Sequence, residues 1–283
     1  MISATLLGQS VLSGLFSGCL YALLGLGLTL SWRYLRIINL AHFALIFLAA
    51  YIAYWMNSAY GFHPLLTCLA MIPAFFALGV AQQLLFIRFK VGEFASVIVT
   101  FGLTIIVESL IQWIWSADFV RMETHLARGS LEIGKLLAPW DELFMCAVAI
   151  SVCVATWACL NFTWLGKALR ASLDNPDIAA SFGVPNRALA LLVSGAAASF
   201  AAIGGVFVAL LYTLTPSSIY SWFGVVLATV LLGGLGSPLG AIAAGLLIGV
   251  GEAMTMAVVA PSWAPIAPFT LLILILVLWP ERI

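Results

Sequence analysis

The chain carries one long polar stretch that also shows signals of regular structure, residues 164–187, with the sequence WLGKALRASLDNPDIAASFGVPNR. Residues 167–173 favour a helix. Asn175 is suited to cap a second helix, Pro176 to take its first position, and Asp177 to face the positive end of the helix dipole. The stretch therefore predicts two short helices between two long apolar runs.

The second of these helices is expected to have an apolar side. Ile178, Ala179 and Phe182 supply that side, and Gly183 is placed to end the helix. A chain built of membrane spans rarely keeps an amphipathic piece between them unless another protein docks on it. We therefore expect residues 164–187 to be a docking loop. Its candidate contact residues are Lys167, Arg170, Asp177, Ala179, Ala180, Phe182 and Gly183.

The rest of the chain is strongly apolar. Of its 283 residues 64% are hydrophobic and 8% are charged, and the mean hydropathy is +1.17. In soluble domains about a quarter of all residues are charged. We therefore expect an all-α polytopic membrane protein, with a single transmembrane domain over residues 1–283. The formal net charge is zero, which makes nucleic acid an implausible partner.

Apolar runs long enough to cross a bilayer, which takes roughly 20 residues, predict eight or nine membrane segments. Residues 221–232 are apolar but short, and the sequence GGLGSPLG at residues 233–240 separates them from the next run. This short segment either crosses the membrane or is re-entrant. The expected segments are residues 6–30, 39–55, 64–86, 94–115, 143–162, 188–214, 221–232, 241–259 and 265–279.

The distribution of positive charge predicts the orientation. If residues 164–187 are cytoplasmic and every segment crosses, eight of the eleven Lys and Arg are cytoplasmic, in agreement with the positive-inside rule. Residues 117–142, which contain five Asp and Glu, then form an extracytoplasmic loop. The N-terminus is extracytoplasmic and the C-terminus cytoplasmic. The cytoplasmic cations are Arg33, Arg36, Arg88, Lys90, Lys167, Arg170, Arg187 and Arg282.

Two carboxylates, Glu108 and Glu252, lie inside expected spans, toward the extracytoplasmic half of each. A charge at the centre of a span costs about 2.5–3.5 kcal/mol on insertion scales, so such residues face a cavity or a partner. Each glutamate either lines a translocation path or is a hydrogen-bonded carboxyl that ties helices together. Gln112 lies one turn from Glu108 and is expected to support it.

Asn39 and His42 are further candidates for the translocation path. They are three residues apart, so we expect them to share a helix face near the cytoplasmic interface. The alternative is that His42 is a helix-packing group whose hydrogen bonds are satisfied, which is the commoner role of a lone histidine at such a position.

Glycines at helical spacing predict close contacts between helices. Gly14 and Gly18 form a GxxxG pair, and small residues at this spacing let two helix backbones approach. Gly245, Gly249 and Glu252 fall at i, i+4 and i+7, which places them on one helix face. A carboxyl on a packed face needs a proton, a hydrogen-bond donor or a watery cavity.

Motifs for catalysis and for nucleotide or metal binding are absent from the sequence. It contains no GxxxxGK[ST], HExxH or GxSxG, and no acid–base pair that suggests hydrolysis. The five cysteines lie in apolar runs without CxxC or a nearby histidine pair. We therefore expect no disulfide, no metal, no cofactor and no enzymatic activity.

Several blocks in one order resemble the permeases of the branched-chain amino acid ABC-importer family. Residues 166–184 are similar to the family's cytoplasmic loop that couples to the ATPase, and the first blocks are closer to its H-type than to its M-type permease. Phe43 departs from the pattern, because the family has glycine there. The other matching blocks are GLFSGCLYALLGLGLTLS at 14–31, LRIINLAH at 35–42, TFGLTIIVESLIQWIW at 100–115 and LLGGLGSPLGAIAAGLLIGVGEA at 231–253.

The resemblance implies a type II ABC-importer permease fold in the bacterial inner (cytoplasmic) membrane. It also implies a second, M-type permease, two ATP-binding subunits on the coupling loop, and an extracytoplasmic solute-binding protein. The implied solute is a branched-chain or related amino acid. Because Phe43 is a departure, a urea or amide importer of the same family stays open. An ion-gradient-driven secondary transporter is the rival class, and it would show an inverted repeat with paired broken helices.

Overall fold

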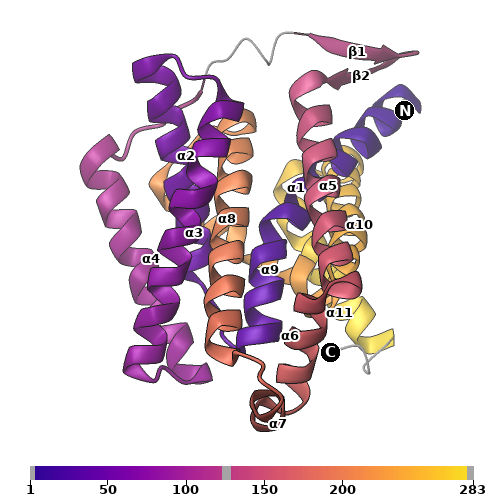
Figure 1. Ribbon diagram of the computed structural model, residues 1–283. Coiled ribbons are helices and arrows are strands. Elements are labelled where there is room, and N and C mark those ends of the chain that lie inside the picture. The colour runs from indigo at the N-terminus through magenta and orange to yellow at the C-terminus, as the bar shows by residue number, and fades with distance from the viewer. Residues whose placement is uncertain (1–3, 123–128, 279–283) are drawn as a thin grey trace.

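The computed structural model describes residues 4–122 and 129–278. Figure 1 shows long helices that run side by side between two ends of the molecule. One end, the hairpin end, carries the start of helix α1 and a β-hairpin, and the opposite end, the α7 end, carries the short helix α7. The charged residues Glu123, Arg128 and Arg282, and the expected end of the last span at Trp279, lie outside the described residues.

The helices match most of the expected segments. Within residues 4–122 and 129–278, eight helices are long and apolar enough to cross a membrane, and a shorter apolar segment covers Pro261–Ile275. This confirms the prediction of eight or nine membrane segments. The bounds are α1 Ala4–Leu35, α2 Ala41–Tyr60, α3 Pro64–Phe89, α4 Glu93–Trp115, α5 Trp140–Phe162, α6 Trp164–Asp174, α7 Pro176–Ser181, α8 Asn186–Leu211, η2 Pro216–Ser218, α9 Ile219–Gly233, α10 Pro238–Val258, η3 Pro261–Ile266 and α11 Ala267–Leu278.

The expected loop 117–142 contains regular structure. Strands β1 (Ser130–Ile133) and β2 (Leu136–Pro139) pair antiparallel. Gln9 of α1 holds the hairpin, because its Nε2 donates to the Leu137 carbonyl at 2.8 Å and its Oε1 accepts from the Leu137 N–H at 3.0 Å. Helix α5 begins at Trp140, earlier than the expected residue 143, so the loop is shorter than the sequence predicted.

Helices α1 and α8 form the centre of the bundle, and α8 packs against α1, α2 and α3. Small residues permit these contacts. Ser194 donates its hydroxyl to the Gly79 carbonyl of α3 at 2.9 Å, and a Cβ at Gly205 would lie 2.6 Å from the Cβ of Ala49 on α2. Close packing of backbones replaces the hydrophobic effect as the source of attraction between helices in lipid.

The two glycine patterns of the sequence face each other where α1 crosses α10. A Cβ added to Gly18 would lie 2.5 Å from the Gly245 carbonyl oxygen, and one on Gly249 would lie 2.5 Å from the Gly18 nitrogen. A Cβ on Gly14 would lie 2.7 Å from the Cα of Val250. Neither helix can carry a side chain at these positions without moving away from the other.

Helix α9 is the short segment whose course the sequence left open. Near its start, Leu214 pairs with Val120 through backbone hydrogen bonds of 3.1 and 2.8 Å, just beyond the hairpin-side end of α4. After its last residue, Gly236 packs on Arg33, close to the α7-side end of α1. The 15 residues of α9 span about 22 Å at 1.5 Å each. The segment thus passes from one side toward the other and does not return as a re-entrant loop would.

Candidate functional site

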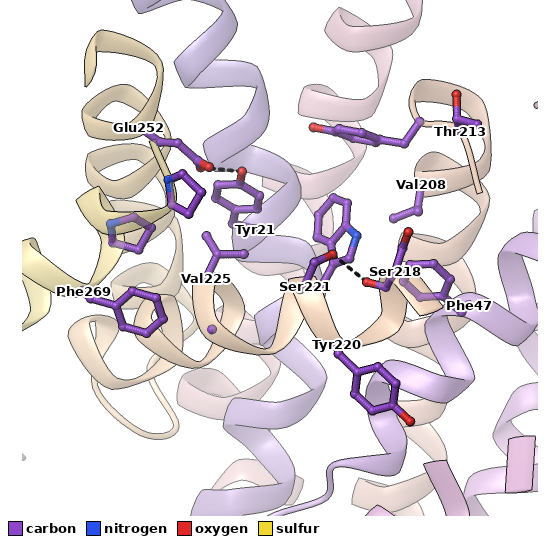
Figure 2. A pocket seen from close by; sticks show the side chains of 15 residues that line it. Tyr21, Phe47, Val208, Thr213, Ser218, Tyr220, Ser221, Val225, Glu252 and Phe269 are labelled. Carbon is purple, nitrogen blue, oxygen red and sulfur yellow. Dashed lines mark hydrogen bonds between the residues drawn. The ribbon is translucent and has the colours of Figure 1, made fainter. Parts of the chain in front are cut away.

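Two neighbouring cavities lie beside α1 and α10, with volumes of about 640 and 610 Å³, and α9 lines the larger of them. Three residues line both of them, namely Tyr21, Tyr212 and Glu252. The larger cavity extends along the start of α9 to η3 and α11, as Figure 2 shows. The smaller one extends along α1 toward its N-terminal turns. Glu252 therefore stands where the two cavities meet.

The carboxylate of Glu252 is held by α1. Tyr21 donates its hydroxyl to Oε2 at 2.7 Å, as the dashed line in Figure 2 shows. The two helices run antiparallel, and side chains lean toward the N-terminus of their own helix, so these two residues lean toward each other across the glycine crossing. The predicted face of Gly245, Gly249 and Glu252 is confirmed, and the carboxyl on it has both a donor and a cavity.

Tyr21, which holds this carboxylate, belongs to a group of three aromatic rings that line the larger cavity. Trp222 of α9 meets the ring of Tyr21 edge-on at a centroid distance of 6.1 Å, and the ring of Tyr212 in the same way at 5.1 Å. Sequence reasoning did not identify these three residues. A signal for Tyr21 was available, because Gly14, Gly18 and Tyr21 repeat the i, i+4, i+7 spacing that Gly245, Gly249 and Glu252 show on the partner helix.

Glu108 makes a second carboxylate cluster, on α4. Tyr220 of α9 donates its hydroxyl to Glu108 Oε2, and Gln112 donates Nε2 to Oε1 at 3.2 Å. The supporting role expected for Gln112 is confirmed. Tyr220 lines the larger cavity, whereas Glu108 and Gln112 do not. Glu108 therefore ties α4 to α9 directly behind the cavity wall, and its place in a translocation path stays a prediction.

Asn39 and His42 do not share a helix face, so that expectation is wrong. Asn39 lies before α2, in the segment that joins it to α1, and its Oδ1 accepts from Gln82 Nε2 of α3 at 2.9 Å. His42 is 1% exposed, and its Nε2 lies 3.0 Å from the Leu24 carbonyl of α1. Neither residue lines the two cavities above. A helix-packing role fits His42 better than a place in the path.

The polar stretch at the α7 end has the predicted local structure. Asn175 accepts from the backbone N–H of Asp177 and Ile178 at 3.1 and 3.0 Å, so it caps α7 as expected. Gly183 has a φ of +83°, a conformation that favours glycine, and ends the helix. Helix α6 is longer than expected, because Thr163 caps it and it begins at Trp164.

The three apolar residues predicted for the side of α7 differ in their exposure. Ala179 is buried, whereas Ile178 is 56% exposed and Phe182 is 86% exposed. Arg170 donates Nη1 to the Leu160 carbonyl at 2.8 Å and so also holds α6 to the end of α5. The remaining docking candidates, Lys167, Asp177, Ala180 and Gly183, are exposed.

Within the described parts of the chain, no group of three or more His, Cys, Asp or Glu is arranged to hold a metal ion. The five cysteines are free thiols. The polar groups that the described residues bring to the two cavities include one carboxylate, the Gln9 amide, and the hydroxyl groups of serine, threonine and tyrosine.

Comparison with known proteins agrees with this architecture. The family described as "Branched-chain amino acid transport system / permease component" matches residues 10–276. The permease LivH of Escherichia coli K12 is 23% identical over 296 residues, which cover 97% of this chain and 94% of that protein. LivH of Salmonella typhimurium LT2 is 24% identical over 295 residues, and BraD of Pseudomonas aeruginosa is 23% identical over 290, each with the same coverage.

No solved structure matches the chain. The family match covers most of the sequence, and the relatives are high-affinity branched-chain amino acid transport system permease proteins matched over nearly their whole length. Together with the eight apolar helices found in the described part of the chain, these findings identify a multi-pass inner-membrane protein that belongs to the family of branched-chain amino acid transport permeases.

Proposed function

We propose that this chain is an H-type permease subunit of an ABC importer and forms, with a second permease of the M type, the membrane path for branched-chain or related amino acids. The observation that carries the proposal is the separation of two features. A capped, exposed helix pair lies at the α7 end, and the cavities around Glu252 lie toward the hairpin end. An importer that is driven by separate ATP-binding subunits, here called the motor, needs one surface that contacts these subunits and another that contacts the solute.

The motor surface is α6 and α7. The sequence has no nucleotide-binding loop of its own, so we assign ATP hydrolysis to two separate ATP-binding subunits on the cytoplasmic side. Exposed apolar side chains on a short helix outside the spans, here Ile178 and Phe182, are the kind of group that anchors a protein interface. On this assignment the chain itself has no catalytic activity and needs no cofactor.

The test of the motor is uptake into proteoliposomes that contain the whole transporter. With internal ATP and the solute-binding protein outside, we expect accumulation of labelled leucine, and none when a sodium or proton gradient replaces ATP. Accumulation driven by an ion gradient without ATP would support a secondary transporter instead. Accumulation of labelled urea or acetamide but not of leucine would assign the chain to the urea and amide importers of the family.

The hairpin end is the side that we assign to the solute-binding protein. Residues 117–142 carry mixed charge and include the exposed hairpin, and the distribution of Lys and Arg supports an extracytoplasmic position for them. A cysteine in place of Ser130, which is exposed on β1, should react with a membrane-impermeant thiol reagent in intact spheroplasts. The unmodified chain is the control for the native thiols. Reaction only after the membrane is opened would show that the hairpin is cytoplasmic and that the proposed orientation is wrong.

A further inference from the structure

The carboxylate of Glu252 has an oxygen available to a ligand. Oε2 accepts from Tyr21, whereas no described residue donates a hydrogen bond to Oε1. The side chain is half-buried and borders both cavities. This carboxylate is therefore only partly satisfied by the protein itself.

No described residue that lines the two cavities is a counter-ion for Glu252. Among the described residues that line the two cavities, it has the only charged side chain, and none of them is lysine, arginine or histidine. A carboxylate in a cavity between membrane helices attracts a positive partner strongly, because water screens it poorly. The same cavity offers an anion no charged partner.

The rings beside Glu252 suit the same kind of ligand. A cation is attracted to the face of tyrosine and tryptophan rings within about 6 Å. Tyr21, Tyr212 and Trp222 all line the larger cavity, and Trp222 meets each tyrosine edge-on. The ring planes of Tyr21 and Tyr212 stand at 76° and 88° to that of Trp222, so Trp222 does not stack face to face on either tyrosine, and all three rings contribute to the lining of the cavity.

We propose that Glu252, with the rings of Tyr21, Tyr212 and Trp222, is a recognition site for a primary ammonium group of the transported solute. The proposal deepens the proposed function and rests on it, since it names the solute group that this site selects. An amino acid carries such a group, whereas urea and simple amides do not. The Ser218 hydroxyl, which also hydrogen-bonds to the Thr215 hydroxyl, lies across the cavity from Glu252 in Figure 2 and is a further polar group for the rest of the solute.

The rival interpretation is that Glu252 only anchors α10 to α1 through Tyr21. An anchor would show no preference between solutes of different charge. The two interpretations are therefore separated by ligands that share one branched five-carbon skeleton and differ in the charge of the head group. Suitable ligands are 3-methylbutylammonium, 3-methylbutanamide and 3-methylbutanoate, which are cationic, neutral and anionic.

The experiment measures protection of a cysteine placed in the cavity. Ser221 is exposed and lines the larger cavity, so Ser221→Cys is introduced into the full transporter after the five native cysteines are replaced by alanine. Its rate of reaction with a methanethiosulfonate reagent is followed in the presence of each ligand. Ser130→Cys in the same background is the matched control, because β1 lies outside both cavities and its labelling should not respond.

We expect 3-methylbutylammonium to protect at a concentration at least about tenfold lower than the amide or the acid. Glu252→Gln should raise its half-protecting concentration about tenfold, to the level of the neutral amide, since a hydrogen bond to a charged group is replaced by a neutral one. Glu93→Gln removes an exposed carboxylate at the first residue of α4, outside both cavities. It should leave the half-protecting concentration of 3-methylbutylammonium unchanged. If Ser221→Cys fails to assemble, Thr213→Cys, also exposed and in the lining, takes its place.

Equal protection by the three ligands, or protection by the ammonium compound that Glu252→Gln leaves intact, would overturn the proposal. ATP-driven uptake of leucine by the transporter with its native sequence is measured alongside. Ammonium-selective protection without ATP-driven uptake would refute the proposed function, whereas the proposed ammonium site would stand. Uptake with no ammonium selectivity in the cavity would refute the site and leave the function.

Discussion

Replacing Gly249 with leucine is expected to remove nearly all folded protein from the membrane. A Cβ at this position would lie 2.5 Å from the backbone nitrogen of Gly18, and the carbonyl oxygen of Gly14 is also in the way. Both obstacles are backbone atoms, so no rotamer change relieves the clash, and α1 must separate from α10. Overpacking a core costs about 1–3 kcal/mol where side chains can adjust, so we expect a larger loss here.

The loss is measured as the yield of monodisperse protein after detergent extraction and as its melting temperature. Gly102→Leu is the matched control, because Gly102 is also a glycine inside a spanning helix, and a Cβ there would meet nothing within 4 Å. That variant should keep the yield and melting temperature of the native chain. Normal yield and melting temperature for Gly249→Leu would show that α1 and α10 do not depend on their close approach.

Replacing Ala180 with glutamate is expected to lower ATP-driven uptake at least about tenfold, because one buried charge in an interface costs on the order of 2 kcal/mol or more. Ala180 is exposed on α7 between Ile178 of the same helix and Phe182, which directly follows the helix, and both of these carry large exposed apolar side chains. The substitution lies outside the bundle, so the permease should still insert and fold. Uptake and co-purification of the ATP-binding subunits should both fall.

A matched control is Ala188→Glu, the same change at an exposed position in the first turn of α8, where the helix dipole tolerates a carboxylate. It should leave uptake and co-purification near the native level. Retention of both properties by Ala180→Glu, and also by Phe182→Ser, would remove α7 as the motor contact.

The sequence predicted features that depend on neighbouring residues. The long apolar runs predicted the spanning helices, because bilayer thickness sets a minimum length. Asn175 and Pro176 predicted the start of α7, since a cap is made within one turn of the chain. The spacing of Gly245 and Gly249 predicted a packed face on α10, because helical periodicity alone decides which residues share a face.

The same local signals failed where a distant partner competes. Asn39 lies outside α2 and bonds to Gln82 of α3, so its spacing from His42 carries no information about a shared face. The hairpin β1–β2 lies in a stretch predicted as loop, and a side chain of α1 holds it, that of Gln9. Tertiary contacts of this kind override weak local preferences.

The candidate site shows most clearly which features follow from local sequence and which depend on tertiary contacts. By itself the sequence determined that Glu252 lies on a close-packed helix face inside a membrane span, since this follows from periodicity and hydropathy. Only the tertiary structure decided that its partner is Tyr21, 231 positions away, that Tyr212 borders the same two cavities, and that Trp222 borders the larger one. The physical reason is that side-chain partners across a helix crossing are selected by the relative rotation and depth of two helices, which no residue spacing within either helix encodes.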